Sequence, residues 1–236
     1  MLGWIKEYKR NKLLRNCRKD VATDFINLGD VSSMGFIFAI TSQESVALLM
    51  DIYKVFKSKG VPFKGLAIET RKNVFSREVP QTAGNSQAGG NSQAAGNSQA
   101  GENSQTAENS QSGATSHKGG KPQPVIPEEL AQAVWLKVIP YEKLNWLGVV
   151  EQTEVEDFFR SQTDLFISFN STGCFTLDYT FANYVKSPMR IGMVNNPDMP
   201  YSMVVEGKDK SVLAPMDYLE QVFHYLDVIK TSTIKI

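Results

Sequence analysis

The chain has 236 residues, of which 42% are hydrophobic, and its basic and acidic side chains balance at 25 each. This balance gives no indication of a nucleic acid or an acidic ligand as partner of the whole protein, and no run approaches the ~18 apolar residues of a membrane span. The two cysteines lack the spacing of a metal site. We expect both to be reduced thiols, and we expect a cytoplasmic location without a signal peptide, because no apolar segment follows the basic amino terminus.

Residues 1–20 predict a basic amphipathic helix whose apolar stripe shifts halfway along its length. They carry seven basic and two acidic side chains, a net charge of +5, so that the other 216 residues together carry −5. At the 100° spacing of a helix, two apolar groups fall on different faces: Leu2, Trp4, Ile5 and Tyr8 in the first half, and Leu13, Leu14 and Cys17 in the second. We therefore expect the second half to pack on the protein while the first half projects from it.

The projecting tip carries the residues that we expect to contact a partner: Trp4, Ile5, Lys6, Tyr8, Lys9 and Arg10. Aromatic rings beside lysines suit the interface of an anionic membrane or the groove of a protein partner. Two other interpretations stay open. The helix could be solvated with a few residues docked on its own domain, or it could bind RNA, which is the least favoured because nothing else in the chain indicates nucleic-acid recognition.

Residues 21–78 predict the first part of an α/β domain. The apolar run Gly35–Ile40 indicates a buried strand, and it leads into a helix whose start has Thr41 and Glu44 at the spacing of a capping box. A second strand is expected at residues 63–68. Two strands joined by one helix form a right-handed βαβ unit, so we expect these strands to be parallel.

Residues 79–124 predict a disordered insertion. The tripeptide Asn-Ser-Gln recurs there every six residues, at positions 85, 91, 97, 103 and 109. A hexapeptide period can indicate a β-helix, but that coil needs an aliphatic residue in every turn, and residues 81–121 contain no Leu, Ile, Val, Met or aromatic side chain. Without such side chains, burial cannot offset the loss of chain entropy on folding. The segment is therefore expected to serve as a spacer or to have no function.

Residues 125–236 predict the second part of the domain. Strands are expected at residues 134–139, 165–169 and 189–194, with an edge strand at 201–206. Helices are expected after a capping box formed by Thr153 and Glu156, at 175–186, and at 216–229. The alternation predicts a three-layer α/β fold, Rossmann-like or flavodoxin-like, with a mostly parallel sheet of about five or six strands and helices on both faces.

The carboxyl ends of parallel strands share one edge of a sheet, where ligands bind in open α/β folds. Polar residues follow the expected strands there, and we define them as the candidate ligand rim: Thr41, Ser42, Gln43, Glu69, Arg71, Asn170, Ser171, Thr172 and Asn195. The rim is almost uncharged and adjoins a helix start, so an anionic or sugar-like small molecule would suit it. The simpler interpretation is that these are loop ends whose polar groups satisfy the backbone.

No motif in the chain predicts catalysis. One of its two histidines, His117, lies in the expected insertion, and the other, His224, lies in the expected last helix, so no serine or cysteine has an evident base. Glycine-rich nucleotide loops, zinc-protease patterns and calcium loops are missing from the sequence. We expect a protein without catalytic residues, cofactor or metal, although the sequence leaves an enzyme open.

Several segments resemble a bacterial family known only as a domain of unknown function. The segments that carry the resemblance, after a basic amino terminus, are Met34–Ile40, Leu144–Gly148, Asp164–Phe169 and Met189–Gly192. The resemblance covers nearly the whole chain apart from the Asn-Ser-Gln insertion, which departs from the pattern. It implies a fold and no activity.

A more distant resemblance concerns the first domain of two-domain glycosyltransferases of the heptosyltransferase kind. Asp164–Asn170, Leu177–Val185 and Lys186–Met193 are similar to a strand, a helix and a Pro-x-Arg-Ile-Gly strand that follow in that order there. In that family a second α/β domain holds most of the sugar nucleotide, and no residues are left here to build one. The resemblance therefore supports the sheet and argues against transferase activity by this chain alone.

Two hypotheses on function follow. In the first, a non-catalytic cytoplasmic α/β protein docks through its basic amino-terminal helix on a protein partner or on a membrane surface, where it would be peripheral to the inner membrane. In the second, the protein binds a small molecule at the candidate ligand rim, as a binding protein or an enzyme.

Overall fold

The computed structural model describes residues 2–17, 25–70 and 124–229. The expected insertion at 79–124 lies outside these ranges except for Pro124, and so does Arg71 of the candidate ligand rim. The described strands are β1 (Met34–Ile40), β2 (Phe63–Glu69), β3 (Leu136–Ile139), β4 (Leu165–Ser168), β5 (Met189–Gly192) and β6 (Met203–Val204). The described α-helices are α1 (Leu2–Asn16), α2 (Gln43–Ser58), α3 (Glu128–Ala131), α4 (Gln152–Arg160), α5 (Phe175–Tyr184) and α6 (Pro215–Val228). Short 3-10 turns lie at η1 (Leu28–Asp30), η2 (Tyr141–Lys143) and η3 (Lys208–Lys210).

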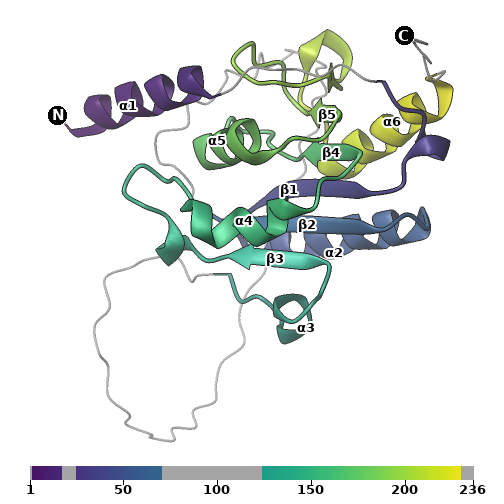
Figure 1. Ribbon diagram of the computed structural model, residues 1–236, viewed down its shortest axis with the longest axis horizontal. Coiled ribbons are helices and arrows are strands. Elements are labelled where there is room, and N and C mark those ends of the chain that lie inside the picture. The colour runs from purple at the N-terminus through teal and green to yellow at the C-terminus, as the bar shows by residue number, and fades with distance from the viewer. Residues whose placement is uncertain (1, 18–24, 71–123, 230–236) are drawn as a thin grey trace, which may run out of the picture. The chain divides into compact units, whose positions relative to one another are not determined.

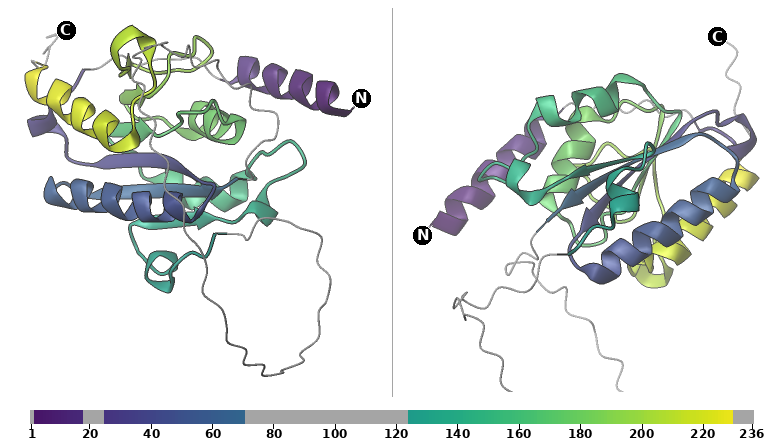
Figure 2. Two further views of the ribbon diagram at one scale, coloured as in Figure 1. Left: turned by 180° about the vertical axis from the view of Figure 1, so that it is seen from behind. Right: turned by 90° about the horizontal axis from the view of Figure 1, so that it is seen from below.

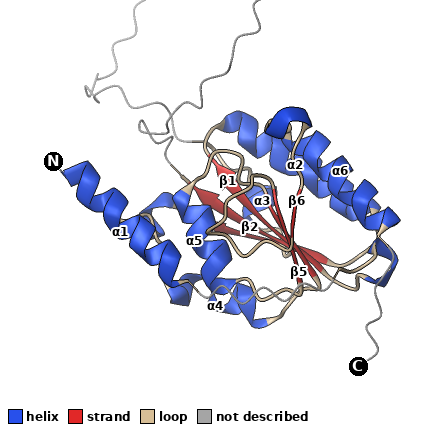
Figure 3. Ribbon diagram, turned by 90° about the horizontal axis from the view of Figure 1, so that it is seen from above, coloured by secondary structure: helices blue, strands red, loops and turns tan. Residues whose placement is uncertain are grey.

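The six strands form one sheet in the order β3-β2-β1-β4-β5-β6, and every pairing between them is parallel. Helices cover both faces, with α2 and α6 on one side and α1, α4 and α5 on the other (Figures 1 and 3). The predicted three-layer α/β fold is confirmed, with its amino-terminal helix. The strand order is that of the dinucleotide-binding Rossmann fold, in which the direction of strand addition reverses between β1 and β4.

Strand β1 occupies the centre of the sheet. All seven of its residues pair with β2, and Met34–Ile37 also pair with β4. Two glycines allow the close side-chain packing that this position requires. A Cβ atom on Gly35 would lie 2.5 Å from the Phe166 ring of β4, and one on Gly65 of β2 would lie 2.3 Å from the Phe36 ring. The apolar run identified in the sequence is therefore the strand that both halves of the sheet are built on.

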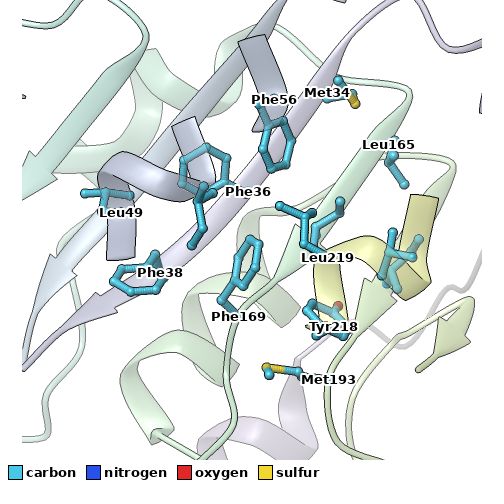
Figure 4. Packing of buried hydrophobic residues seen from close by; sticks show 14 of the residues in the cluster. Met34, Phe36, Phe38, Leu49, Phe56, Leu165, Phe169, Met193, Tyr218 and Leu219 are labelled. Carbon is cyan, nitrogen blue, oxygen red and sulfur yellow. The ribbon is translucent and has the colours of Figure 1, made fainter. Parts of the chain in front are cut away.

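Apolar side chains fill two cores, one on each face of the sheet. The core under α2 and α6 is rich in aromatic rings, some of which meet edge to face, such as Phe169 and Tyr218 with centroids 5.5 Å apart (Figure 4). The core under α4 and α5 contains Phe166 and Phe181, and Cys17 at the end of α1 is buried in it. Successive strand residues alternate between the two cores, as a sheet covered on both faces requires.

A carboxylate at the amino end of β4 connects this strand to the segment before β1. Asp164 Oδ2 accepts hydrogen bonds from the backbone N–H groups of Ser32 (2.9 Å) and Ser33 (3.0 Å) and from both hydroxyl groups. The bond from the Ser32 hydroxyl, with the other bonds from both serines, lowers the pKa of Asp164. The ionised carboxylate thus fixes where β4 begins relative to β1.

The helix starts differ from the predicted capping boxes. Helix α2 is capped by Ser42, and the box closes on Ser45, whose hydroxyl accepts from the backbone N–H of Ser42 at 3.1 Å. The predicted pair of Thr41 and Glu44 is therefore wrong by one residue. Helix α4 begins at Gln152, so Thr153 already lies inside the helix and cannot be its cap. The expected edge strand at 201–206 is only the two residues of β6.

We predict that residues 125–236 do not fold when they are expressed alone. This segment supplies β3 and β4, but β2 and β1 lie between them in the sheet, so both strands would lose a pairing edge and the two cores would open. Far-ultraviolet circular dichroism during heating measures the outcome, with the full chain as control. A cooperative thermal transition of the fragment, similar to that of the full chain, would contradict the prediction.

Candidate functional site

The rim residues after β1 are engaged in local structure. The Ser45 hydroxyl accepts hydrogen bonds from the backbone N–H groups of Thr41 (3.0 Å) and Ser42. The Gln43 side chain bonds to the backbone of Val125 in both directions, at 3.1 and 3.3 Å. These contacts favour the simpler interpretation for this part of the rim, because the backbone N–H groups of Thr41 and Ser42 and the side chain of Gln43 already have partners within the chain.

The remaining rim residues do not form a single cluster with these. Glu69 accepts a hydrogen bond from the backbone of Tyr141 at 3.2 Å, and the Asn195 backbone donates to Glu206 at 2.8 Å. Ser171 is half-buried and Thr172 is exposed in the loop between β4 and α5. The loop after β1 leads to the α2 face of the sheet and the loop after β4 leads to the α5 face. The topology therefore directs the rim residues after β1 and those after β4 to opposite faces of the sheet, although their positions at strand ends predicted one shared site.

Asn170 is the rim residue that belongs to a buried polar network. Its side chain is 4% exposed, and its Oδ1 atom accepts from the backbone N–H of Cys174 at 2.8 Å. Its Nδ2 atom donates to the Cys174 carbonyl at 3.1 Å and to Asp178 Oδ1 at 2.8 Å. Asn196, in the loop after β5, also bonds to the Asp178 carboxyl. This network joins the carboxyl ends of β4 and β5 to the first turn of α5.

Asp178 was not among the candidate residues of the sequence. Burial raises its pKa from the ordinary 3.8 to about 6, although the bonds from Asn170 and Asn196 act in the opposite direction. Burial also raises the pKa of the nearby Cys174 thiol and of the Tyr201 hydroxyl. A signal was present in the sequence, since Asp178 lies on the same helical face as the apolar residues Phe181 and Val185. Such a carboxyl changes its charge near neutral pH, which is a property of acid–base groups and of ligand-responsive networks.

Contacts of Arg10 hold helix α1 next to the start of α5, close to this network. Arg10 Nε donates a hydrogen bond to the Leu147 carbonyl at 2.7 Å, and its guanidinium group lies 4.8 Å from the centroid of the Phe175 ring, at the start of α5. Burial lowers the pKa of Arg10, and the neighbouring Cys174 and Tyr141 act against this. Leu14 and Cys17 pack in the core under α5. Arg10, one of the expected partner contacts, is thus bound to its own chain.

The first half of α1 presents aromatic rings to the surroundings. Trp4 is 74% exposed and Tyr8 is 60% exposed, and their rings stack with centroids 6.2 Å apart. Ile5 is exposed as well, and burial together with the charge of Arg10 lowers the pKa of Lys6. The Lys9 ammonium lies 5.1 Å from the ring centroid of Trp146. Figure 2 shows the amino-terminal end of α1 extending away from the sheet.

We therefore distinguish two candidate sites. The first is the exposed aromatic and basic tip of α1, formed by Trp4, Ile5, Lys6, Tyr8 and Lys9, and the second is the buried network of Asn170 and Asp178. Among the described residues, no group of three or more His, Cys, Asp or Glu side chains is placed to hold a metal ion. None of the described helices combines the length and the apolar character needed to cross a membrane.

Residues 127–229 match the model of a family of unknown function, DUF6913. The match covers less than half of the chain and runs from the residue before α3 to the residue after α6. It confirms the expected resemblance to a family of unknown function over this segment, and the resemblance to glycosyltransferases stays a prediction. Comparisons with curated proteins and with solved structures gave no match.

The matched segment includes the network of Asn170 and Asp178 but neither α1 nor the central strand β1. It is therefore not a complete sheet by itself, because β1 and β2 separate its strands β3 and β4. The match supplies no residue role, so the geometry of the two candidate sites carries the functional argument.

We predict that Asp178 makes the folded state less stable as pH rises. Its folded pKa is raised to about 6, so between pH ~4 and ~6 the folded state keeps a proton that the unfolded state has lost, and the free energy of unfolding falls by on the order of 3 kcal/mol. In Asp178→Asn this decrease should be missing. Urea unfolding from pH 4 to 8 measures it, with Glu220→Gln, an exposed carboxylate on α6, as control. The same pH profile in wild type and Asp178→Asn would contradict the prediction.

Proposed function

We propose that this protein is a non-catalytic docking module whose helix α1 places the α/β domain on an anionic membrane surface. The observation that carries the proposal is the stacked pair of Trp4 and Tyr8, which is strongly exposed on a basic helix while Arg10 and Cys17 hold the other half of the helix to the domain. A helix fixed at one end with aromatic rings at the other is suited to attach the domain to a second surface.

The chemistry of the tip favours a lipid surface. Trp and Tyr have an apolar ring and a polar group, so they are enriched at the boundary between lipid headgroups and acyl chains. Lysine and arginine near an anionic leaflet each contribute ~1 kcal/mol to binding, and Lys6, Lys9 and Lys12 lie on the same helix as the rings. The cytoplasmic face of an inner membrane has the required negative charge, and we propose that location.

The shift of the apolar stripe favours docking through the first half of α1 only. A helix that lies flat in a membrane interface needs one continuous apolar face. Here Leu14 and Cys17 belong to the core of the domain, so they are not available to lipid. The alternative of a solvated helix accounts for Arg10 and Cys17, but it gives no reason for the exposure of two stacked rings.

We predict that the full chain binds vesicles that contain phosphatidylserine at low ionic strength. It should dissociate from them at high ionic strength, because salt screens the attraction between its basic side chains and the anionic lipids. The variant Trp4→Ala/Tyr8→Ala should bind at least about tenfold more weakly, since it loses the apolar area of two rings. Vesicle cosedimentation measures both effects. Tyr225→Ala is the matched control, because Tyr225 is an exposed aromatic residue on α6, which covers the opposite face of the sheet.

The membrane proposal would be overturned if the full chain stayed in the supernatant with these vesicles at low ionic strength. Equal binding by wild type and the double variant would also contradict it, because charge alone would then explain the association. Thermal unfolding of the variant checks that its fold is intact. In the first of these outcomes a protein partner for the same tip would remain to be sought.

The buried network supports a second candidate function, the binding of a small anionic or sugar-like molecule. Asn170 and Asp178 lie after β4, next to the position where the strand order reverses, which is where open α/β sheets bind ligands. A carboxyl with a pKa of about 6 at that position is the specific observation that favours it. In this form of the hypothesis the protein is a binding protein or an enzyme.

We predict, for this second function, a rise in thermal stability with one class among nucleotides, sugar phosphates and flavins. A ligand that binds only the folded state adds ~2.7 kcal/mol when its concentration is 100 times its Kd. Asp178→Asn should change the size of the shift, whereas Glu220→Gln on the opposite face should not. The absence of a shift with every class would leave membrane docking as the function.

A further inference from the structure

Trp146 lies in a short loop close to helix α1. The loop between β3 and α4 is closed by an antiparallel bridge between Leu144 and Val150. Inside it, Asn145 Oδ1 accepts from the backbone N–H groups of Leu147 at 2.9 Å and Val149 at 3.1 Å. These bonds fix the backbone on both sides of Trp146, so the ring is presented by a well-defined turn.

The ring of Trp146 is nevertheless 58% exposed. The hydrogen bonds hold the backbone of the turn, and the exposed apolar area of the ring is in contact with water, which costs free energy. The neighbouring Lys9 ammonium, 5.1 Å from the ring centroid, covers only part of it. The loop itself is held against α1 by the bond between Arg10 and the Leu147 carbonyl. Trp146 and the tip of α1 are therefore parts of one surface region.

We propose that Trp146 is a second membrane anchor, which acts together with the tip of α1. This inference rests on the proposed docking function and specifies its geometry. Two anchors on different elements determine how the domain is oriented on the lipid surface. Because the loop follows β3 and α1 lies over the start of α5, the carboxyl ends of the strands would face the membrane.

The two anchors contribute different kinds of binding energy. The basic residues belong to α1, whereas the one lysine of the loop region, Lys143, is paired with Glu154 at 2.8 Å. Glu142 and Glu151 are exposed nearby, so the loop region carries a net negative charge and adds nothing to the electrostatic attraction. Trp146 should therefore supply apolar insertion without changing the electrostatic attraction, and its removal should weaken binding equally at all salt concentrations.

The test uses the full chain and vesicles of phosphatidylcholine and phosphatidylserine. Trp146→Ala is expected to reduce binding about tenfold, from the apolar area of one ring, with the same salt dependence as wild type. Lys12→Gln/Arg15→Gln, which changes exposed charges on α1, is expected to reduce the salt dependence instead. Tyr225→Ala is again the control for an exposed ring elsewhere.

Fluorescence with brominated acyl chains locates the individual rings. In Trp4→Phe the emission of Trp146 should be quenched by these lipids, and in Trp146→Phe that of Trp4 should be quenched. The double variant Trp4→Phe/Trp146→Phe retains Trp135, which packs against Tyr53 and Phe63 on the other face and should not be quenched.

The outcomes separate this inference from the function on which it rests. If wild type binds vesicles and Trp4 is quenched, but Trp146 is not quenched and Trp146→Ala binds like wild type, the second anchor is wrong and docking through α1 stands. If wild type does not bind vesicles at all, the proposed function fails together with the anchor. Quenching of Trp146 with weaker binding by Trp146→Ala supports the inference, because a ring that served only to hold Lys9 would not reach the acyl chains.

Discussion

The pairing of β1 along both of its edges is the constraint on which the rest of the structure depends. Its register with β2 and β4 places two segments that are far apart in sequence on either side of one buried strand. Gly35 and Gly65 permit the close approach of the Phe166 and Phe36 rings, and Asp164 fixes the start of β4 relative to β1. The two cores then pack on the two faces of the sheet around β1, β2 and β4.

The reversal of strand order at β1 also determines where the candidate sites lie. The loop after β1 turns to the α2 face, where Ser45 completes a helix cap, while the loop after β4 turns to the α5 face. On that second face the Asn170 network holds the start of α5, and Phe175 there receives Arg10 of α1. The docked helix, the Trp146 loop and the buried Asp178 carboxyl are therefore neighbours because of the sheet topology.

Much of the fold could be predicted from residue patterns. The strand at Gly35–Ile40, the helix that follows it and the last helix have strong periodicity, and the alternation of elements indicated a parallel sheet. The strand order could not be derived, because a βαβ pattern allows addition on either side of β1. The cap of α2 was predicted one residue early, since Thr41, Ser42 and Ser45 offer competing hydroxyl groups that only the backbone path decides between.

The candidate sites were predicted less completely, for physical reasons that differ between residues. Trp4 and Tyr8 are exposed as the shift of the stripe in α1 suggested, but Arg10 bonds to a loop 137 positions away, which local patterns do not encode. Asp178 was not predicted because an acidic residue inside a short helix is usually solvated, and its burial follows from a network formed by two loops and helix α5. Trp146 was not among the predicted contact residues, although its ring is largely exposed.

Native-state hydrogen exchange, followed residue by residue, tests the central role of β1 most directly. Amides of Phe36–Ala39 should exchange only through global unfolding, so their opening free energy should equal that of the whole domain and should exceed the values in the edge strands β3 and β6. Amides of α1 should open at lower free energy, because one half of this helix contacts the domain. The account would be contradicted if β1 exchanged through local openings while either edge strand stayed protected.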